Sequence, residues 1–243
     1  MNFKKRLILL TLVSLLSAGR IFAHDQGDLM LHIEPQVGLS MPSINSSDLT
    51  QSSINNYDSF KSSTVGVEYA FGIKVHYWFL DFLGVNAGLG IRGIIDSWSW
   101  DGSININSSK SGSGIFTRAY FAVPVGIRFS LDAFVVGGGL SLNLPLGSTS
   151  ETYNGFTKNT MWDNGFYLNN YLGWYFDVGF DLSGKTGAEG GYGMALRFAG
   201  SFSDDLSGAK GSSYNFKIKY WDFSVSVVFS PAIQLANFGG RGK

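Results

Sequence analysis

Apolar and polar residues alternate along most of the chain. From Leu29 to Leu39 the odd positions are apolar, while the even positions include histidine, glutamate, glutamine and glycine. A period of two is typical of a β-strand with two chemically different faces. The last such run changes phase at Trp221, which predicts a β-bulge. The eight expected strands are Leu29–Leu39, Val65–Tyr77, Val85–Arg92, Ile115–Phe129, Phe134–Leu144, Phe166–Phe180, Tyr192–Phe202 and Tyr214–Phe229.

The connections between these strands differ in length. Four of them, Pro42–Ser63, Asp101–Gly114, Leu146–Gly165 and Ser203–Ser212, are long and rich in serine, asparagine, glycine and threonine. The remaining connections, which alternate with these four along the chain, are shorter. Elaborate loops at one end and tight turns at the other are typical of outer-membrane barrels.

The two faces of the expected strands differ in bulk. One face carries leucine, isoleucine, valine and aromatic residues, and the other carries glycine, alanine and serine with a few long charged side chains. A soluble lipocalin-like barrel would hold the bulky face inside, but the interior of an eight-stranded barrel is only just wide enough for side chains to fill. The bulky face therefore points outward, where only lipid tolerates it. The sequence predicts an all-β protein, an eight-stranded antiparallel up-and-down transmembrane β-barrel.

Composition narrows the function classes. The chain has 32 glycines, 15% aromatic and 15% charged residues, no cysteine and a formal net charge of zero. Its aromatic content and low charge exclude disorder, and the missing cysteine excludes disulfides and cysteine zinc sites. Without a basic excess to neutralise phosphates, we expect no nucleic-acid partner.

The first residues have the layout of a secretory signal peptide. Three basic residues, at positions 4–6, precede the apolar run Leu7–Leu16, and Ile21–Ala23 ends in a small residue suited to cleavage. This run is too short for a transmembrane helix, which needs about 20 residues. We expect residues 1–23 to be the signal peptide, residues 24–229 the barrel and residues 230–243 a short C-terminal tail.

The architecture resembles the small outer-membrane barrels of the OmpA, OmpX and OmpW kind. The sharpest part of the resemblance is the alternation at the end of the last expected strand, formed by Trp221, Phe223, Val225, Val227 and Phe229. It implies a location in the outer membrane of a diderm bacterium, contact with its lipid, and recognition of this stretch by the barrel-assembly machinery. This chain departs from the pattern by continuing for 14 residues, Ser230–Lys243, beyond that phenylalanine.

Charged residues recur on the inward face. Charges buried in a narrow barrel need pairing or water, which leaves two interpretations: an ion-pair network that fills the lumen, or a narrow polar pore. Counting from the short turns places Glu34 beside Lys74 on neighbouring strands, and Arg197 level with Asp222. The expected lumen network comprises Glu34, Glu68, Lys74, Arg92, Arg118, Arg197, Lys219 and Asp222.

Other motifs point away from catalysis. Residues Gly88–Gly93 match G-x-G-x-x-G, but inside a strand and not between a strand and a helix, so we expect no dinucleotide cofactor. His32 and His76 could form a metal pair, but no carboxylate or cysteine obviously accompanies them, which favours ordinary polar lumen residues. Barrel enzymes that modify lipids typically hold a histidine near the outer leaflet, and this chain has none on the loop side. We expect no catalytic residue, metal or cofactor.

Two functions remain open. The first is a non-enzymatic outer-membrane barrel with a charge-paired lumen, which displays loops for structural, adhesive or host-contact roles. Its contact surface for an extracellular ligand would be loops 42–63 and 146–165, since long loops on a rigid scaffold commonly carry function. The alternative is a narrow channel for small polar or apolar solutes.

Overall fold

The computed structural model describes residues 24–41, 43–45, 59–62, 65–105, 108–146, 150–153, 167–183, 190–202, 206–207, 219–221 and 223–239. The expected signal peptide, residues 1–23, lies outside this part of the chain. Within the described ranges, no helix has the length and apolar character needed to cross a membrane.

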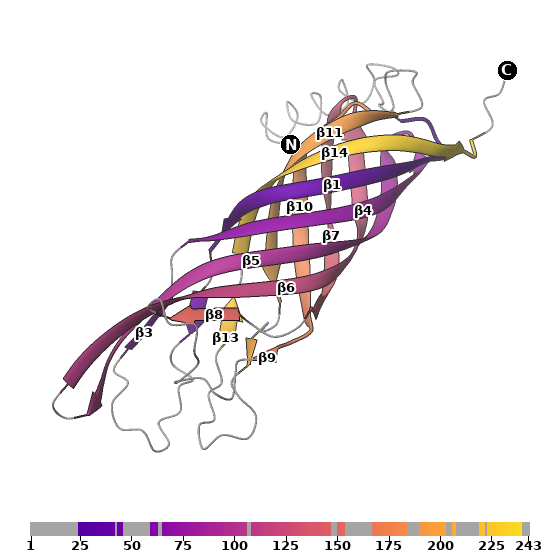
Figure 1. Cartoon of the computed structure of the whole chain (residues 1–243). Helices are drawn as coiled ribbons and strands as arrows, with labels where there is room; N and C mark the ends of the chain where they lie inside the picture. The colour runs from indigo at the N-terminus through magenta and orange to yellow at the C-terminus, as the bar shows by residue number, and fades with distance from the viewer. Residues whose placement is uncertain are drawn as a thin grey trace, which may run out of the picture.

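Eight long strands close into a barrel (Figure 1). They follow one another around the barrel in chain order, every neighbouring pair is antiparallel, and the last pairs with the first. The expected eight-stranded up-and-down barrel is confirmed. The strands are β1 (Asp28–Ser40), β4 (Gly66–Leu80), β5 (Leu83–Asn105), β6 (Ser108–Leu131), β7 (Phe134–Pro145), β10 (Tyr171–Asp181), β11 (Gly190–Ser201) and β14 (Phe223–Asn237).

Six short strands lie toward the long-loop end: β2 (Ser43–Asn45), β3 (Ser59–Ser62), β8 (Ser150–Tyr153), β9 (Tyr167–Leu168), β12 (Leu206–Ser207) and β13 (Lys219–Trp221). They pair with one another or with the outer parts of β5 and β6.

The hairpin of β5 and β6 extends far beyond the barrel wall (Figure 1). Its strands are 23 and 24 residues long, whereas crossing a membrane takes about 9–11 residues. The prediction of a loop at Asp101–Gly114 is therefore wrong, because β5 and β6 pair with each other there, as at Asp101 with Ser111. Strand β3 pairs with β5 and β8 pairs with β6, which makes a four-stranded sheet outside the barrel, the outer sheet.

Side chains alternate between the outside and the lumen. On β4, Tyr69, Phe71 and Ile73 are 44–55% exposed, whereas Glu68 and Lys74 are at most 4% exposed. Large apolar side chains are exposed in the same way on all eight strands. A surface of this kind is stable only against lipid, so the barrel spans a membrane with its charged residues inside.

The last strand differs from the sequence prediction. Strand β14 continues to Asn237 and pairs there with Asp28, so the expected end of the barrel at Phe229 is wrong and the tail begins later. The predicted bulge at Trp221 is also wrong, because β13 with β2 and β14 with β1 follow the same register. The register shift lies at the opposite end of β1, between Leu29 and Met30.

Candidate functional site: the charged lumen

The middle of the lumen holds four interlocked charges, the middle level. The Nζ atom of Lys74 lies 2.9 Å from Glu34 Oε2, and Arg197 Nη2 lies 3.0 Å from the same oxygen. Arg197 also donates from Nε to Asp177 Oδ1 at 2.7 Å. These residues come from β1, β4, β10 and β11, so one cluster of charges ties half of the barrel strands together.

Four further charges form the upper level, toward the long loops. Arg92 Nη2 lies 2.8 Å from Glu68 Oε2, and Arg118 pairs with Asp96. All four side chains are at most 10% exposed. Because both cations are buried with a carboxylate, the cost of removing them from water is partly offset.

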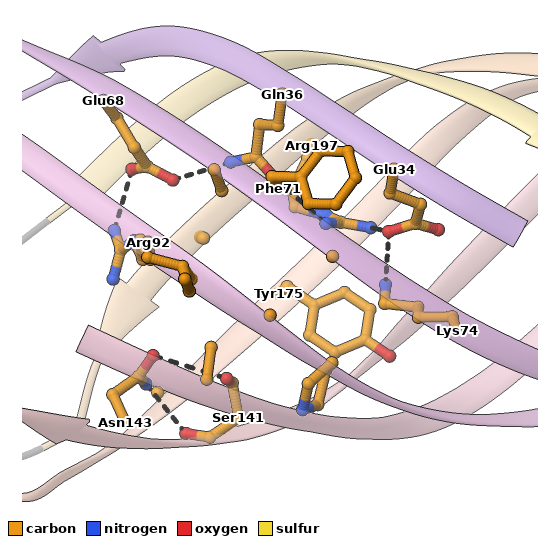
Figure 2. A pocket seen from close by; sticks show the side chains of 18 of the residues that line it. Glu34, Gln36, Glu68, Phe71, Lys74, Arg92, Ser141, Asn143, Tyr175 and Arg197 are labelled. Carbon is orange, nitrogen blue, oxygen red and sulfur yellow. Dashed lines mark hydrogen bonds and ion pairs between the residues drawn. The ribbon is translucent and has the colours of Figure 1, made fainter. Parts of the chain in front are cut away.

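Gln36 joins the two levels (Figure 2). Its Nε2 donates to Glu68 Oε1 at 2.6 Å, and its Oε1 accepts from Arg197 Nη1 at 3.0 Å. The middle level and the Arg92–Glu68 pair are thus one connected network. Each carboxylate in it is held by a cation, an arrangement that favours structure over acid–base chemistry.

Hydrogen bonds also cross the lumen. Tyr175 on β10 donates to Asn86 Oδ1 on β5 at 2.7 Å, and Tyr171 on β10 accepts from Arg92 on β5. Strands β5 and β10 are not neighbours in the barrel, so these bonds run across its interior. The Tyr175 hydroxyl fits only because the facing residue is Gly126, where a Cβ atom would lie 2.3 Å away from it.

A small cavity remains beside this network. Its volume is about 80 Å³, and its lining includes Lys74, Tyr175 and Arg197 together with the backbone of Gly72 and Gly90 (Figure 2). This is room for a few water molecules. The cavity is much smaller than the aqueous channel of a porin, which needs a barrel of about 16 strands.

The lower level, near the short turns, is built from histidines. Arg128 Nη2 lies 3.0 Å from Asp181 Oδ2, and His24 Nε2 lies 3.6 Å from the same atom. The rings of His32 and His76 are 4.1 Å apart, which confirms that these two residues are lumen neighbours. Among the described residues, no group of three or more histidine, aspartate or glutamate side chains is arranged to hold a metal ion.

The structure brings most of the expected network together. Glu34, Glu68, Lys74, Arg92, Arg118 and Arg197 all form buried ion pairs. The predicted contact of Glu34 with Lys74 is confirmed. The contact is diagonal, since Lys74 lies opposite His32 in the ladder and Glu34 lies opposite Gly72.

The other predicted pair falls on Asp222, which lies outside the described residues. Arg197 lies opposite Ser226 in the ladder, and its ion-pair partners are Asp177 and Glu34. Because β14 continues past Phe229, the short-turn end of this strand lies later in the chain than the sequence predicts. Lys219 lies on β13, before the start of β14, and its side chain is also outside the described part of the structure.

Gln36, Asp96 and Asp181 belong to the lumen networks but are absent from the expected set. Asp96 could have been found by extending the alternation past Arg92, since Ile95 is exposed and Asp96 is buried. The expected strand stops at Phe180, but Asp181 is the last residue of β10. Nothing in the sequence marks Gln36 as the link between two levels, because that role depends on strands distant in the chain.

The expected assembly-signal residues lie on one end of the last barrel strand. Phe223, Val227 and Phe229 are 38–47% exposed on the outer face of β14, with Val225 between them. Trp221 lies on β13. The alternation of outward apolar residues continues to Ile233 and Leu235, at 52% and 51% exposure.

Comparisons with solved structures find similar barrels. The chain is similar to the outer membrane protein OprG from Pseudomonas aeruginosa, with 16% identity, 87% of this chain and 97% of that chain covered and a TM-score of 0.49. It is similar to the outer membrane protein AlkL in lipid bilayers, with 11% identity, 90% and 95% covered and a TM-score of 0.42. It is also similar to the attachment invasion locus protein Ail of Yersinia pestis, with 11% identity, 84% and 99% covered and a TM-score of 0.29.

No protein-family model and no curated protein sequence matches the chain. At these identities and TM-scores, no residue role passes from the similar structures to this chain. The class of the protein rests on its own geometry: a closed antiparallel barrel of eight strands, an apolar exterior and a charged lumen. This is the architecture of the small outer-membrane β-barrel proteins.

Proposed function

We propose that the chain is a non-enzymatic outer-membrane barrel with a closed lumen, which displays a structured contact surface outside the membrane. The observation that carries this proposal is the pair of cross-lumen hydrogen bonds from β10 to β5. Together with the ion pairs of the middle and upper levels, they fill the interior with paired and hydrogen-bonded side chains. A solute would have to break several buried charge-assisted bonds to pass, each of which costs about 1.5–3 kcal/mol.

The outer sheet is the candidate contact surface. Its two central strands belong to the β5–β6 hairpin, and its edge strands β3 and β8 come from the two loops proposed to bind a ligand, 42–63 and 146–165. A paired sheet holds a surface in one shape, which lowers the entropy lost on binding. Exposed sheet edges also accept extended segments of a partner.

Shortening the outer sheet tests its role. Replacing residues 97–115 by a short turn removes the centre of the sheet and leaves the lumen residues Asp96 and Arg118 in place. We expect the variant to keep the heat-modifiable gel mobility of a folded barrel while adhesion of expressing cells to an epithelial-cell layer and to glass falls. A matched control shortens the tail after Asn237. Unchanged adhesion by a folded sheet-deleted variant would contradict the proposal.

A narrow channel for small polar or apolar solutes is the second candidate, favoured by the glycine-lined cavity of about 80 Å³. Planar-bilayer recording separates the two functions. The closed-lumen proposal expects no steady conductance from the wild-type protein. Reproducible unit conductance that Glu34→Gln alters would favour the channel.

The export and assembly of the chain are also proposals. Residues 1–23 would direct secretion, and the outward alternation from Trp221 to Phe229 would be read by the barrel-assembly machinery. The continuation of this alternation to Leu235 supports a signal extended toward the true end of β14. Truncation after Phe229 should then reduce assembled barrel more than truncation after Phe238.

A further inference from the structure

The residues just before β1 fold under the short-turn end of the barrel. The ring of His24 stacks on Trp78, with centroids 4.1 Å apart and an angle of 10° between the planes. His24 is 2% exposed and Trp78 is fully buried. Trp78, Met30 and Ala232 form an apolar cluster next to this contact. The segment thus covers the lumen at the end where the tight turns lie.

Hydrogen bonds hold this segment to three parts of the barrel end. Gly27 N donates to the carbonyl of Trp78 on β4 at 2.7 Å, and the carbonyl of Gly27 accepts from Phe238 N, after β14, at 2.8 Å. Gln26 N donates to Asp81 Oδ1 in the β4–β5 turn at 2.9 Å. The backbone of residues 26–27 therefore bridges the start, the end and one turn of the barrel.

A glycine is required for this path. Gly27 has a φ of +89°, in the left-handed region, and a Cβ atom there would lie 1.9 Å from the nitrogen of Gly239. A side chain at position 27 would be strained by the backbone and would also meet the chain after β14. The seated position of the segment consequently depends on residue 27 having no side chain.

The seated segment buries polar atoms that the protein leaves unbonded. Both ring nitrogens of His24 and the Nε1 atom of Trp78 have no hydrogen-bond partner among the described residues, and His24 Nε2 has only a 3.6 Å contact with Asp181 Oδ2. Burying such atoms opposes the seated state. Besides that contact, residues 24–27 are held by the backbone bonds of Gly27, the bond from Gln26 N to Asp81 and the ring stack on Trp78. They precede β1, so they can move without breaking a strand-ladder pair.

We propose that residues 24–27 form an intramolecular plug, which seals the short-turn end of the lumen and can leave it as a unit. The plug lies below the middle and upper levels of the lumen and touches the lower level where His24 meets Asp181. The plug is a segment of this chain, and the site that receives it is formed by Trp78, Asp81 and the chain after β14. This inference does not depend on the proposed contact function.

Thiol labelling tests the plug, because the chain has no cysteine. Ala232→Cys places a reporter under the plug, at a position 4% exposed, and Gln26→Cys is an exposed reporter. A water-soluble maleimide applied to the full chain in lipid vesicles should label Gln26→Cys and leave Ala232→Cys unlabelled. Adding Gly27→Ala should raise the labelling rate of the Ala232→Cys thiol by roughly ten-fold, since left-handed strain and the clash both disfavour seating.

Two controls distinguish plug release from unfolding. Gly72→Ala, in the wall of β4 where a Cβ would be 3.3 Å from the nearest atom, should leave Ala232→Cys protected. Asp81→Ala removes the acceptor of Gln26 N and should give a smaller rise in labelling than Gly27→Ala. It tests the plug independently if Gly27→Ala folds poorly. Heat-modifiable mobility reports folding in each case. Protection that persists in both folded plug variants, or labelling of Ala232→Cys with the wild-type plug, would overturn the proposal.

Discussion

The middle and lower levels of the lumen face the same interior but are built differently. In the middle level, Glu34, Lys74, Asp177 and Arg197 leave no buried nitrogen or oxygen without a partner. In the lower level, the histidines stack on other rings, and several of their nitrogens have no hydrogen-bond partner in the part of the chain that the structure describes. Satisfied polar networks rigidify a structure, whereas unsatisfied polar atoms weaken it. The barrel thus combines a locked centre with a weaker end.

The largest effect is expected at Glu34, which holds two cations at once. Glu34→Ala leaves Lys74 without its carboxylate and Arg197 with Asp177 alone. Breaking a buried ion pair by removing one partner costs about 3–5 kcal/mol, so the free energy of unfolding should fall by about this amount. Urea unfolding in lipid vesicles, followed by tryptophan fluorescence, measures it. A loss no larger than that of Val37→Ala, an exposed position on the same strand, would remove the basis for a locked centre.

The second prediction concerns coupling between Glu34 and Lys74. Glu34→Ala combined with Lys74→Ala should destabilise the barrel less than the sum of the single variants, because the double variant leaves no unpaired lysine. Couplings of about 0.5–3 kcal/mol are usual for residues in one network. A double-mutant cycle measures the coupling in the same unfolding assay. Strict additivity would show that the 2.9 Å contact contributes nothing specific.

A third, smaller effect is expected at Tyr175. Tyr175→Phe removes the donor to Asn86 Oδ1 and leaves that buried acceptor unbonded, which costs about 1–3 kcal/mol. Asn86→Ala combined with Tyr175→Phe should recover part of the loss, since no polar atom is then stranded. The same unfolding assay measures both variants. An unaltered stability of Tyr175→Phe would mean that the cross-lumen bond does not tie β10 to β5.

The sequence predicts the locked centre better than the weaker end, for a physical reason. Alternation identifies which residues face inward, and Glu34 and Lys74 are close because their strands are antiparallel neighbours in the barrel. The contact of Arg197 with Glu34 depends on the register where the last strand meets the first, which local patterns do not fix. The burial of His24 follows from the left-handed Gly27 and from the chain after β14. Neither feature shows in an alternation pattern.

The sharpest contrast with the centre is expected at His24. His24→Phe keeps a flat ring to stack on Trp78 and removes two buried nitrogens that have no hydrogen-bond partner among the described residues. Asp181, which lies 3.6 Å from His24 Nε2, keeps its ion pair with Arg128. Replacing unsatisfied polar groups by an apolar group of similar shape is nearly neutral or stabilising, so the free energy of unfolding should stay constant or rise by up to about 1 kcal/mol. His24→Ala is the control, because it removes the stack as well and should lower stability. The comparison fails if His24→Phe destabilises the barrel as much as Glu34→Ala, since the lower level would then be as tightly bonded as the middle one.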